Sequence, residues 1–205
     1  RDHVLLEVCR QVGAVVNLAV EVGVNIHLWC GEGKVRTVSA QLANIAKTRP
    51  DENGVPVPCE TWDNAILMFE AQNTAGDTFP MQLEMKRMAP GCTNTVEYEI
   101  YGLNLSARFT TDDPNAIHYT QAVGREQAWA RLVIGQKTLY PVITGSIFEF
   151  GFSDSLLQMF AAFVSELRGL PCSFGCFTPA EAHLSHRVLT AALESYTQKR
   201  VVTLE

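Results

Sequence analysis

Apolar side chains recur along the chain with two different periods, and the first segments show both. Residues 3–12 place valine and leucine on one face with a period of about 3.6 residues, which predicts a short amphipathic helix ending at Gly13. Residues 16–28 have an apolar side chain at every even position, many of them valine, as is typical of a strand. Polar residues four apart in this stretch would also fit a helix, but the β-branched side chains favour the strand.

Alternation of apolar and polar residues continues to residue 134 and predicts a series of strands. The predicted strands cover residues 35–42, 64–71, 79–86, 96–100, 106–110, 117–121 and 129–134. The segment 64–71 is apolar almost throughout, which places it in the centre of a sheet. Residues 49–59 carry three prolines and an Asn-Gly pair, which predicts an exposed loop. Because short turns join consecutive strands, we expect a largely antiparallel sheet.

The period changes after residue 152, where two helices are expected. The first has Ser153 as its N-cap, Gly169 as its stop and an apolar stripe of Leu156, Phe160, Phe163, Val164 and Leu167. The second starts at the capping box Thr178-Pro179-Ala180-Glu181 and has an apolar stripe of Leu184, Val188, Ala192 and Tyr196. Residues 201–204 predict a final strand. Strands followed by paired helices indicate an α+β fold, an open and largely antiparallel β-sheet with helices packed on one face.

The other face of the predicted sheet is polar. The side chains expected on it are Gln82, Glu84, Lys86, Thr95, Glu97 and Glu99. Such a face either meets solvent or forms a hydrated subunit interface, and the sequence leaves both open.

Composition and charge exclude several classes of protein. The chain has 205 residues, of which 47% are hydrophobic and 19% charged, a globular rather than a disordered balance. Its net charge of −6 offers no basic field to nucleic acid or to an anionic membrane. No apolar run is long enough for a transmembrane helix, and Arg1-Asp2-His3 shows no initiator methionine or signal peptide. The six scattered cysteines predict a reduced, cytoplasmic protein without a disulfide framework.

Few residue combinations suggest chemistry. Gly31-Glu32-Gly33 lacks the third glycine of a dinucleotide fingerprint and predicts only a turn. His183 and His186 lack a third convergent ligand, so we expect no metal site. No motif of an activated serine is present, and we assign no catalytic residue. Arg87, at the end of a strand, and Asn94, across a glycine-containing loop, are the candidates for binding substrate hydroxyls or a carboxylate.

Several segments, in the right order, carry a resemblance to a known family. They are Trp62-Asp63-Asn64-Ala65-Ile66-Leu67, Glu97-Tyr98-Glu99-Ile100-Tyr101-Gly102, Phe152-Ser153-Asp154-Ser155-Leu156-Leu157, Phe177-Thr178-Pro179-Ala180-Glu181-Ala182 and Arg200-Val201-Val202. Together they resemble the C-terminal domain of the glucose–fructose oxidoreductase / inositol dehydrogenase (Gfo/Idh/MocA-like) family. In that reading, residues 1–13 are the remnant of a crossover helix from a nucleotide domain. Residues 14–205 are then the substrate-binding and oligomerisation domain.

The resemblance implies a function that the chain only partly supports. Family members bind NAD or NADP in a Rossmann domain and oxidise or reduce sugars and polyols, while the free sheet face of the second domain commonly builds dimers or tetramers. This sequence has no Rossmann domain and no Glu-Lys-Pro segment with the catalytic lysine. The family's helix with Asp and His four apart should precede Trp29, but here the strand-like residues 16–28 stand directly before it. If the family helix is aligned with residues 13–31 instead, Asn17 falls on the Asp and Glu21 on the His, so the His is missing under either alignment. Leu105 occupies a hairpin position where the family usually has glycine.

Three functions remain open at this point. The first is the substrate-binding and oligomerisation domain of an NAD(P)-dependent sugar or polyol oxidoreductase, which is not catalytically competent alone. In this case Trp29 joins Arg87 and Asn94 as a candidate for binding the substrate. For this chain alone we expect no bound cofactor, and a homodimer or homotetramer formed through the open sheet face. The second is a non-catalytic binding or scaffold subunit that dimerises through its sheet. The third is a full oxidoreductase of which the sequence omits segments.

Overall fold

The computed structural model describes residues 34–59, 62–92, 95–122, 124–133, 140–141, 151–172, 176 and 178–204, with only the backbone of Phe152. The predicted helix over 3–12 and the predicted strand over 16–28 lie outside these residues. The described part of the chain belongs to two compact units. One, which we call the α4 unit, contains residues 34–90 and 178–204, and the other, the α3 unit, contains residues 91–176.

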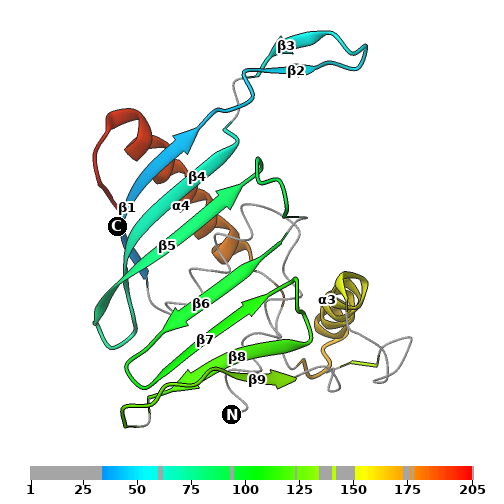
Figure 1. Cartoon of the computed structure of the whole chain (residues 1–205). Coiled ribbons are helices and arrows are strands. Elements are labelled where there is room, and N and C mark those ends of the chain that lie inside the picture. The colour runs from blue at the N-terminus through cyan, green and yellow to red at the C-terminus, as the bar shows by residue number, and fades with distance from the viewer. Residues whose placement is uncertain are drawn as a thin grey trace. The chain divides into compact units, whose positions relative to one another are not determined.

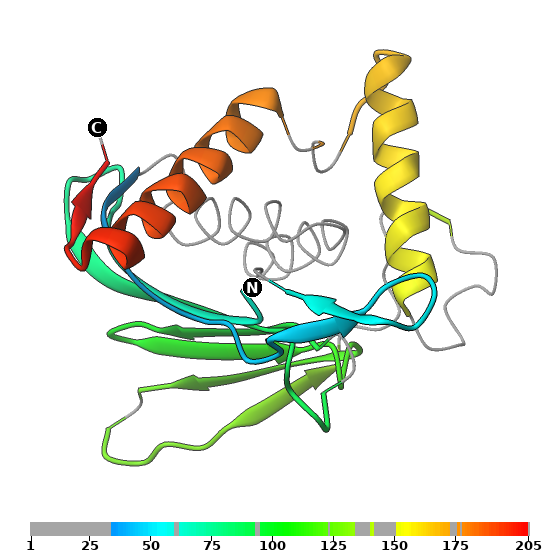
Figure 2. The same ribbon diagram turned by 90° about the horizontal axis from the view of Figure 1, so that it is seen from above.

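The α4 unit is an antiparallel sheet with a helix on one face. Its four strands are ordered β10-β1-β4-β5. They are β1 (Lys34–Ala43), β4 (Asn64–Gln72), β5 (Thr78–Lys86) and β10 (Val202–Thr203). Figures 1 and 2 show helix α4 (Pro179–Gln198) running along one face of this sheet. The segment 64–71 was predicted to be central, and β4 does lie inside the sheet.

The core of the α4 unit lies between that helix and the sheet. Val38 of β1, Leu67 of β4 and Val188 of α4 are at most 1% exposed. Alternate residues of β1 and β4 face this core because successive side chains of a strand point to opposite faces. The predicted stripe of α4 is confirmed, since Val188 and Ala192 are buried and Leu184 and Tyr196 pack against them.

Helix α4 starts where the capping box predicts. The Glu181 backbone N–H donates to Thr178 Oγ1 at 3.3 Å, and the Thr178 backbone N–H donates to the Glu181 carboxylate at 2.7 Å. Pro179 occupies the first helical position, where the missing N–H costs nothing. The helix ends at Lys199, whose backbone is left-handed with φ of 53°.

Ser195 ties α4 to the sheet through a contact that the sequence pattern does not reveal. Its side chain is buried, accepts a hydrogen bond from the Ala40 N–H at 3.1 Å and donates one to the Arg200 carbonyl at 2.6 Å. One hydroxyl therefore satisfies a strand amide and the carbonyl of the segment that leads into β10.

The α3 unit contains a second antiparallel sheet, ordered β6-β7-β8-β9. Its strands are β6 (Glu97–Tyr101), β7 (Leu105–Thr110), β8 (Ala116–Gln121) and β9 (Ala130–Val133), and helix α3 spans Phe152–Leu167. The turn between β6 and β7 requires glycine, because a Cβ on Gly102 would lie 2.9 Å from the Leu105 carbonyl oxygen. Leu105 itself does not have a positive φ, so the family's glycine is not needed there.

The predicted α+β class is confirmed, and three local predictions are corrected. Among the described residues, the strands pair as two four-stranded ladders and one two-stranded ribbon rather than as a single sheet. Helix α3 is capped by Gly151, not Ser153, because the Asp154 carboxylate reaches back to the Gly151 N–H at 2.9 Å. Its predicted apolar stripe is largely exposed, with Phe160 at 57% and Leu167 at 70%. Gly169 follows the helix with a positive φ, as a stop residue should.

Residues 49–59 form a two-stranded ribbon rather than a loop. Strands β2 (Thr48–Pro50) and β3 (Pro56–Pro58) pair antiparallel, and the Asp51 side chain accepts the N–H groups of Asn53 and Val55 to close the turn. The N–H groups of residues 51 and 59 point inward to the partner strand, so the prolines at 50, 56 and 58 fall at outward positions. Prolines there are compatible with pairing and block further strands from adding to the ribbon.

Within the described residues, no helix is both long enough and apolar enough to cross a bilayer.

We predict that Ser195→Ala lowers the free energy of unfolding by about 2 kcal/mol, because it leaves the buried Ala40 N–H and the partly buried Arg200 carbonyl unpaired. The matched control is Ser185→Ala on the same helix. Ser185 is equally buried, but its hydroxyl donates only to the helix's own Glu181 carbonyl, so the loss should stay below about 0.5 kcal/mol. Urea unfolding measures both, and amide exchange at Ala40 should accelerate in Ser195→Ala alone. Equal losses in the two variants would contradict this role.

Candidate functional site

The structure describes only one of the three predicted binding residues. Arg87 follows β5, has an exposed side chain, and donates its backbone N–H to the carbonyl of Asp63 at 2.8 Å. Trp29 and Asn94 lie outside the described residues, so the expected pairing of Arg87 with Asn94 stays a prediction. His183 and His186 are both exposed on α4. Within the described ranges no group of three or more His, Cys, Asp or Glu side chains is placed to hold a metal ion.

The carbonyl that holds Arg87 belongs to a buried aspartate. Asp63 is 4% exposed and lies immediately before β4. Its Oδ2 accepts hydrogen bonds from the backbone N–H groups of Ile45 and Ala46, both at 2.7 Å. Its Oδ1 forms an ion pair with the Arg49 guanidinium. Both carboxylate oxygens therefore have hydrogen-bond or ion-pair partners within the protein.

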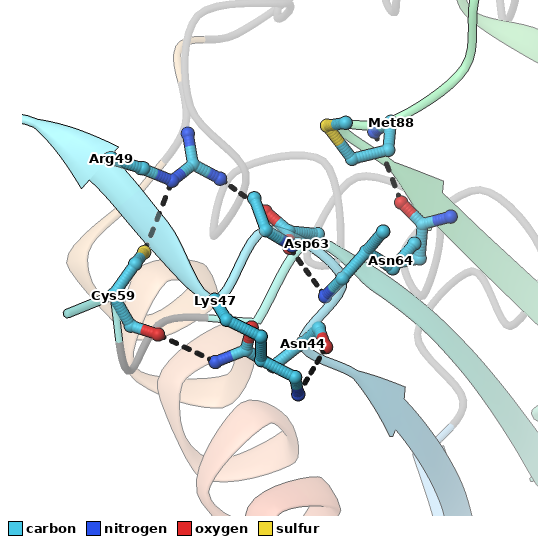
Figure 3. A network of polar contacts seen from close by, with 9 residues as sticks. Asn44, Lys47, Arg49, Cys59, Asp63, Asn64 and Met88 are labelled. Carbon is cyan, nitrogen blue, oxygen red and sulfur yellow. Dashed lines mark hydrogen bonds and ion pairs between the residues drawn. The ribbon is translucent and has the colours of Figure 1, made fainter. Parts of the chain in front are cut away.

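Arg49 extends this network into the base of the ribbon. Its Nε donates to the sulfur of Cys59 at 3.1 Å, and the Cys59 carbonyl accepts a hydrogen bond from the Asn44 side chain at 2.7 Å (Figure 3). The Lys47 ammonium in turn donates to the Asn44 carbonyl at 2.7 Å. The two strands of the ribbon are thus fixed to the end of β1 by side-chain hydrogen bonds as well as by strand pairing.

Backbone contacts of Asp63 and a side-chain contact of Asn64 join three strands at the same end of the sheet. The Asp63 N–H donates to the Ala43 carbonyl at 2.8 Å, at the end of β1. Asn64 Oδ1 accepts the Met88 N–H at 3.1 Å, just after β5 (Figure 3). Together with the bond from Arg87, these contacts hold the segment after β5 beside the start of β4. We call the whole arrangement the Asp63 junction.

The junction holds its carboxylate in the ionised form. The hydrogen bond from the backbone N–H of Ala46 lowers the pKa of Asp63 most, while burial of the carboxylate raises it. The hydrogen bond from the Ile45 N–H and the positive charge of Arg49 lower this pKa further. A carboxylate with three donors and no exposed oxygen cannot exchange protons with a substrate. Asp63 therefore acts through the groups that it holds in place. Its backbone carbonyl fixes the backbone of Arg87, whose side chain is exposed, and its carboxylate fixes Arg49 at the base of the ribbon.

A second contact fixes the chain just before Asp63. The ring of Trp62 meets the ring of Tyr196 edge-on, with centroids 4.8 Å apart, and the Lys199 ammonium lies 3.7 Å from the centroid of the same tyrosine ring. This places the start of β4 against the C-terminal end of α4. Trp62, Asp63 and Asn64 all stand in the segment that carries the family resemblance, and that was the only sequence signal for the junction.

Among the comparisons with known proteins, the one with solved structures identifies the fold. No family model matches the sequence, and no curated protein does. Among solved structures, an oxidoreductase domain protein from Kribbella flavida is 19% identical with a TM-score of 0.73, over 94% of this chain and 50% of that one. Levoglucosan dehydrogenase in its apo form is 17% identical with a TM-score of 0.71, over 94% and 51%. A super-repressor mutant of Gal80p from Saccharomyces cerevisiae is 15% identical with a TM-score of 0.60, over 90% and 47%.

These likenesses establish the fold class. The chain spans about half the length of the solved structures that it matches. Its fold is the α+β fold of one half of such oxidoreductases, as the family resemblance predicts.

We predict that acid weakens the Asp63 junction. The folded-state pKa of Asp63 lies below the ordinary value of 3.8, so its contribution is fully present above that value and is lost as the pH falls through the lowered pKa. Urea unfolding should show a steady midpoint between about pH 7 and 5 and a fall below about pH 4. Asp63→Asn should lower the midpoint at neutral pH and flatten the fall in acid.

The matched control for this experiment is Asp77→Asn, which changes an exposed aspartate in the turn between β4 and β5. It should keep the acid profile of the unchanged protein. Asp113, whose pKa is also lowered, by its bond to Arg131, leaves some acid dependence in every variant. A profile for Asp63→Asn that runs parallel to the unchanged protein would show that Asp63 does not contribute in this way.

Proposed function

We propose that the chain is the substrate-binding and oligomerisation domain of an NAD(P)-dependent sugar or polyol oxidoreductase, and that the 205 residues alone do not transfer hydride. The observation that carries the proposal is the shared fold with half of levoglucosan dehydrogenase, which has also been solved in complex with NADH and L-sorbose. Substrate class and cofactor are carried over from that likeness and from the sequence resemblance.

The described helices offer no place for the cofactor's pyrophosphate. A dinucleotide usually binds at a helix N-terminus that follows a glycine-rich turn, where free N–H groups face the phosphates. Here the starts of α3 and α4 are closed by the carboxylates of Asp154 and Glu181. These charges would repel a phosphate, so we infer that NAD or NADP, which supplies the hydride acceptor, is held elsewhere in the intact enzyme.

This chain's own contribution is to hold the substrate. We propose that Arg87, with Asn94 and Trp29, binds hydroxyl groups of a sugar or polyol. Arg87 suits this role because its side chain is exposed while its backbone is fixed to the buried Asp63. A guanidinium on a fixed backbone loses less freedom when it binds, and this improves affinity without a new contact.

The open face of the sheet in the α4 unit supports oligomerisation. Its centre is apolar, with Ile66 at 40% and Met68 at 59% exposure on β4. Polar side chains surround them on the paired strands, namely Ser39, Gln41, Gln82 and Glu84. An apolar centre with a polar rim is the usual anatomy of a subunit interface. We propose a homodimer or homotetramer built through this face.

A non-catalytic subunit is the second candidate function. The likeness to Gal80p favours it, because a similar fold occurs there in a protein of which a mutant is described as a super-repressor. Under either function, we propose a cytoplasmic protein, since the six cysteines are scattered along the sequence rather than spaced as in a disulfide framework.

The first function predicts no turnover by the purified 205-residue chain. Absorbance of the reduced nicotinamide should not change when the chain is mixed with NAD or NADP and levoglucosan, L-sorbose or inositol. Intact levoglucosan dehydrogenase serves as the positive control for the assay. Hydride transfer to or from any of these compounds would refute the proposal that this chain is not competent alone.

We also predict that Met68→Lys weakens self-association. Placing an ammonium at the centre of an apolar interface should raise the dissociation constant at least about tenfold. Leu193→Lys is the matched control, because Leu193 is 48% exposed on α4, away from the open sheet face. Sedimentation equilibrium at micromolar concentration measures both variants. A strict monomer before mutation, or equal weakening in both, would contradict the proposed interface.

A further inference from the structure

One face of the sheet in the α3 unit carries a row of charged residues directly opposite one another. Strand register pairs Glu99 of β6 with Arg108 of β7, Arg108 with His118 of β8, and His118 with Arg131 of β9. Their side chains share one face because successive residues of a strand alternate. Three cationic or basic groups therefore stand side by side on a chain whose net charge is −6.

Two members of this row already have partners. Arg131 forms a bidentate ion pair with Asp113, in which its Nε lies 2.9 Å from Oδ2 and its Nη2 lies 2.8 Å from Oδ1. The Glu99 carboxylate accepts a hydrogen bond from the Tyr101 hydroxyl at 3.2 Å. Glu99 is the cross-strand neighbour of Arg108 but does not form an ion pair with it, and none of the described carboxylates does.

Arg108 is instead held by an aromatic ring. Its guanidinium carbon lies 4.6 Å from the centroid of the Trp129 ring. Stacking on an aromatic face fixes the guanidinium plane and leaves its N–H edge free to form paired hydrogen bonds. Trp129 is 42% exposed and Tyr101 is 69% exposed, so the surface around Arg108 is accessible.

A hydroxyl without a partner lies on the same face. Thr120 Oγ1 is buried and makes no hydrogen bond in the described part of the protein. Thr120 is two residues after His118 on β8, hence on the same side of the sheet, and it pairs with Ser106, two residues before Arg108 on β7. A buried polar atom without a partner is uncommon in folded proteins and needs an explanation.

We propose that Arg108, His118 and Thr120 form a binding site for the carboxylate or phosphate group of a small ligand, with Trp129 orienting the guanidinium. Arg108 supplies a planar fork that matches either oxyanion. The His118 ring and the Thr120 hydroxyl supply further donors from the neighbouring strand. The site lies wholly within the α3 unit, does not involve Arg87, and does not depend on the proposed function.

Nuclear magnetic resonance of the labelled chain tests the site directly. The probes are sodium acetate and inorganic phosphate, each titrated at constant ionic strength with sodium chloride as the balance. The Arg108 Nε–H and the Trp129 indole N–H should shift and saturate with at least one probe. Tighter binding of acetate identifies a carboxylate ligand, and tighter binding of phosphate identifies a phosphorylated one.

Three variants separate this site from a general effect of charge. Arg108→Gln should weaken binding by about tenfold or more, the loss expected for hydrogen bonds to a charged group. Thr120→Val keeps the shape, removes the hydroxyl, and should weaken binding about threefold. Arg168→Gln is the matched control, because Arg168 is an exposed arginine of the same unit, and it should bind as the unchanged protein does. Shifts that never saturate with either probe, or equal binding by Arg108→Gln, would overturn the proposal.

Discussion

The α4 unit depends on one contact, that of the apolar stripe of α4 with the apolar face of β1 and β4. Val188 belongs to the same core cluster as the strand residues Val38 and Leu67, and all three are at most 1% exposed. Full burial of one such side chain contributes about 1.5–3 kcal/mol, which exceeds most single polar contacts at a protein surface. Because α4 covers this face, the opposite face is left for Ile66, Met68 and their polar neighbours, and a slip of one residue in β1 or β4 would take the apolar side chains out of the core.

The Asp63 junction follows from that arrangement and completes it. Three strands end together, and their last backbone groups need partners that the sheet no longer supplies. Asp63 supplies acceptors for Ile45 and Ala46, and the Arg49 guanidinium balances its buried charge. The result is a rigid end of the sheet that carries the ribbon and the exposed side chain of Arg87, without chemistry at the carboxylate itself.

Local sequence signals predicted the elements better than the contacts between them. The strands, the start of α4 and its buried stripe follow from alternation and from the box at Thr178, which depend on neighbouring residues. Asp63 and Ser195 were missed because their partners lie 14 to 18 and 155 residues away along the chain. The ribbon was mistaken for a loop because composition does not show that its prolines occupy outward positions. Of the predicted binding residues, only Arg87 is described, and its link to Asp63 could not be read from the sequence.

The proposed function gives these 205 residues a part in holding the substrate and none in holding the nucleotide. Titration of NADH fluorescence with the purified chain tests it most directly, because bound NADH fluoresces differently from free NADH whether or not hydride is transferred. Under the proposed function no saturable change is expected, and among the described residues the Asp154 and Glu181 carboxylates close the starts of both helices to a phosphate. A saturable change at one NADH per chain would contradict it.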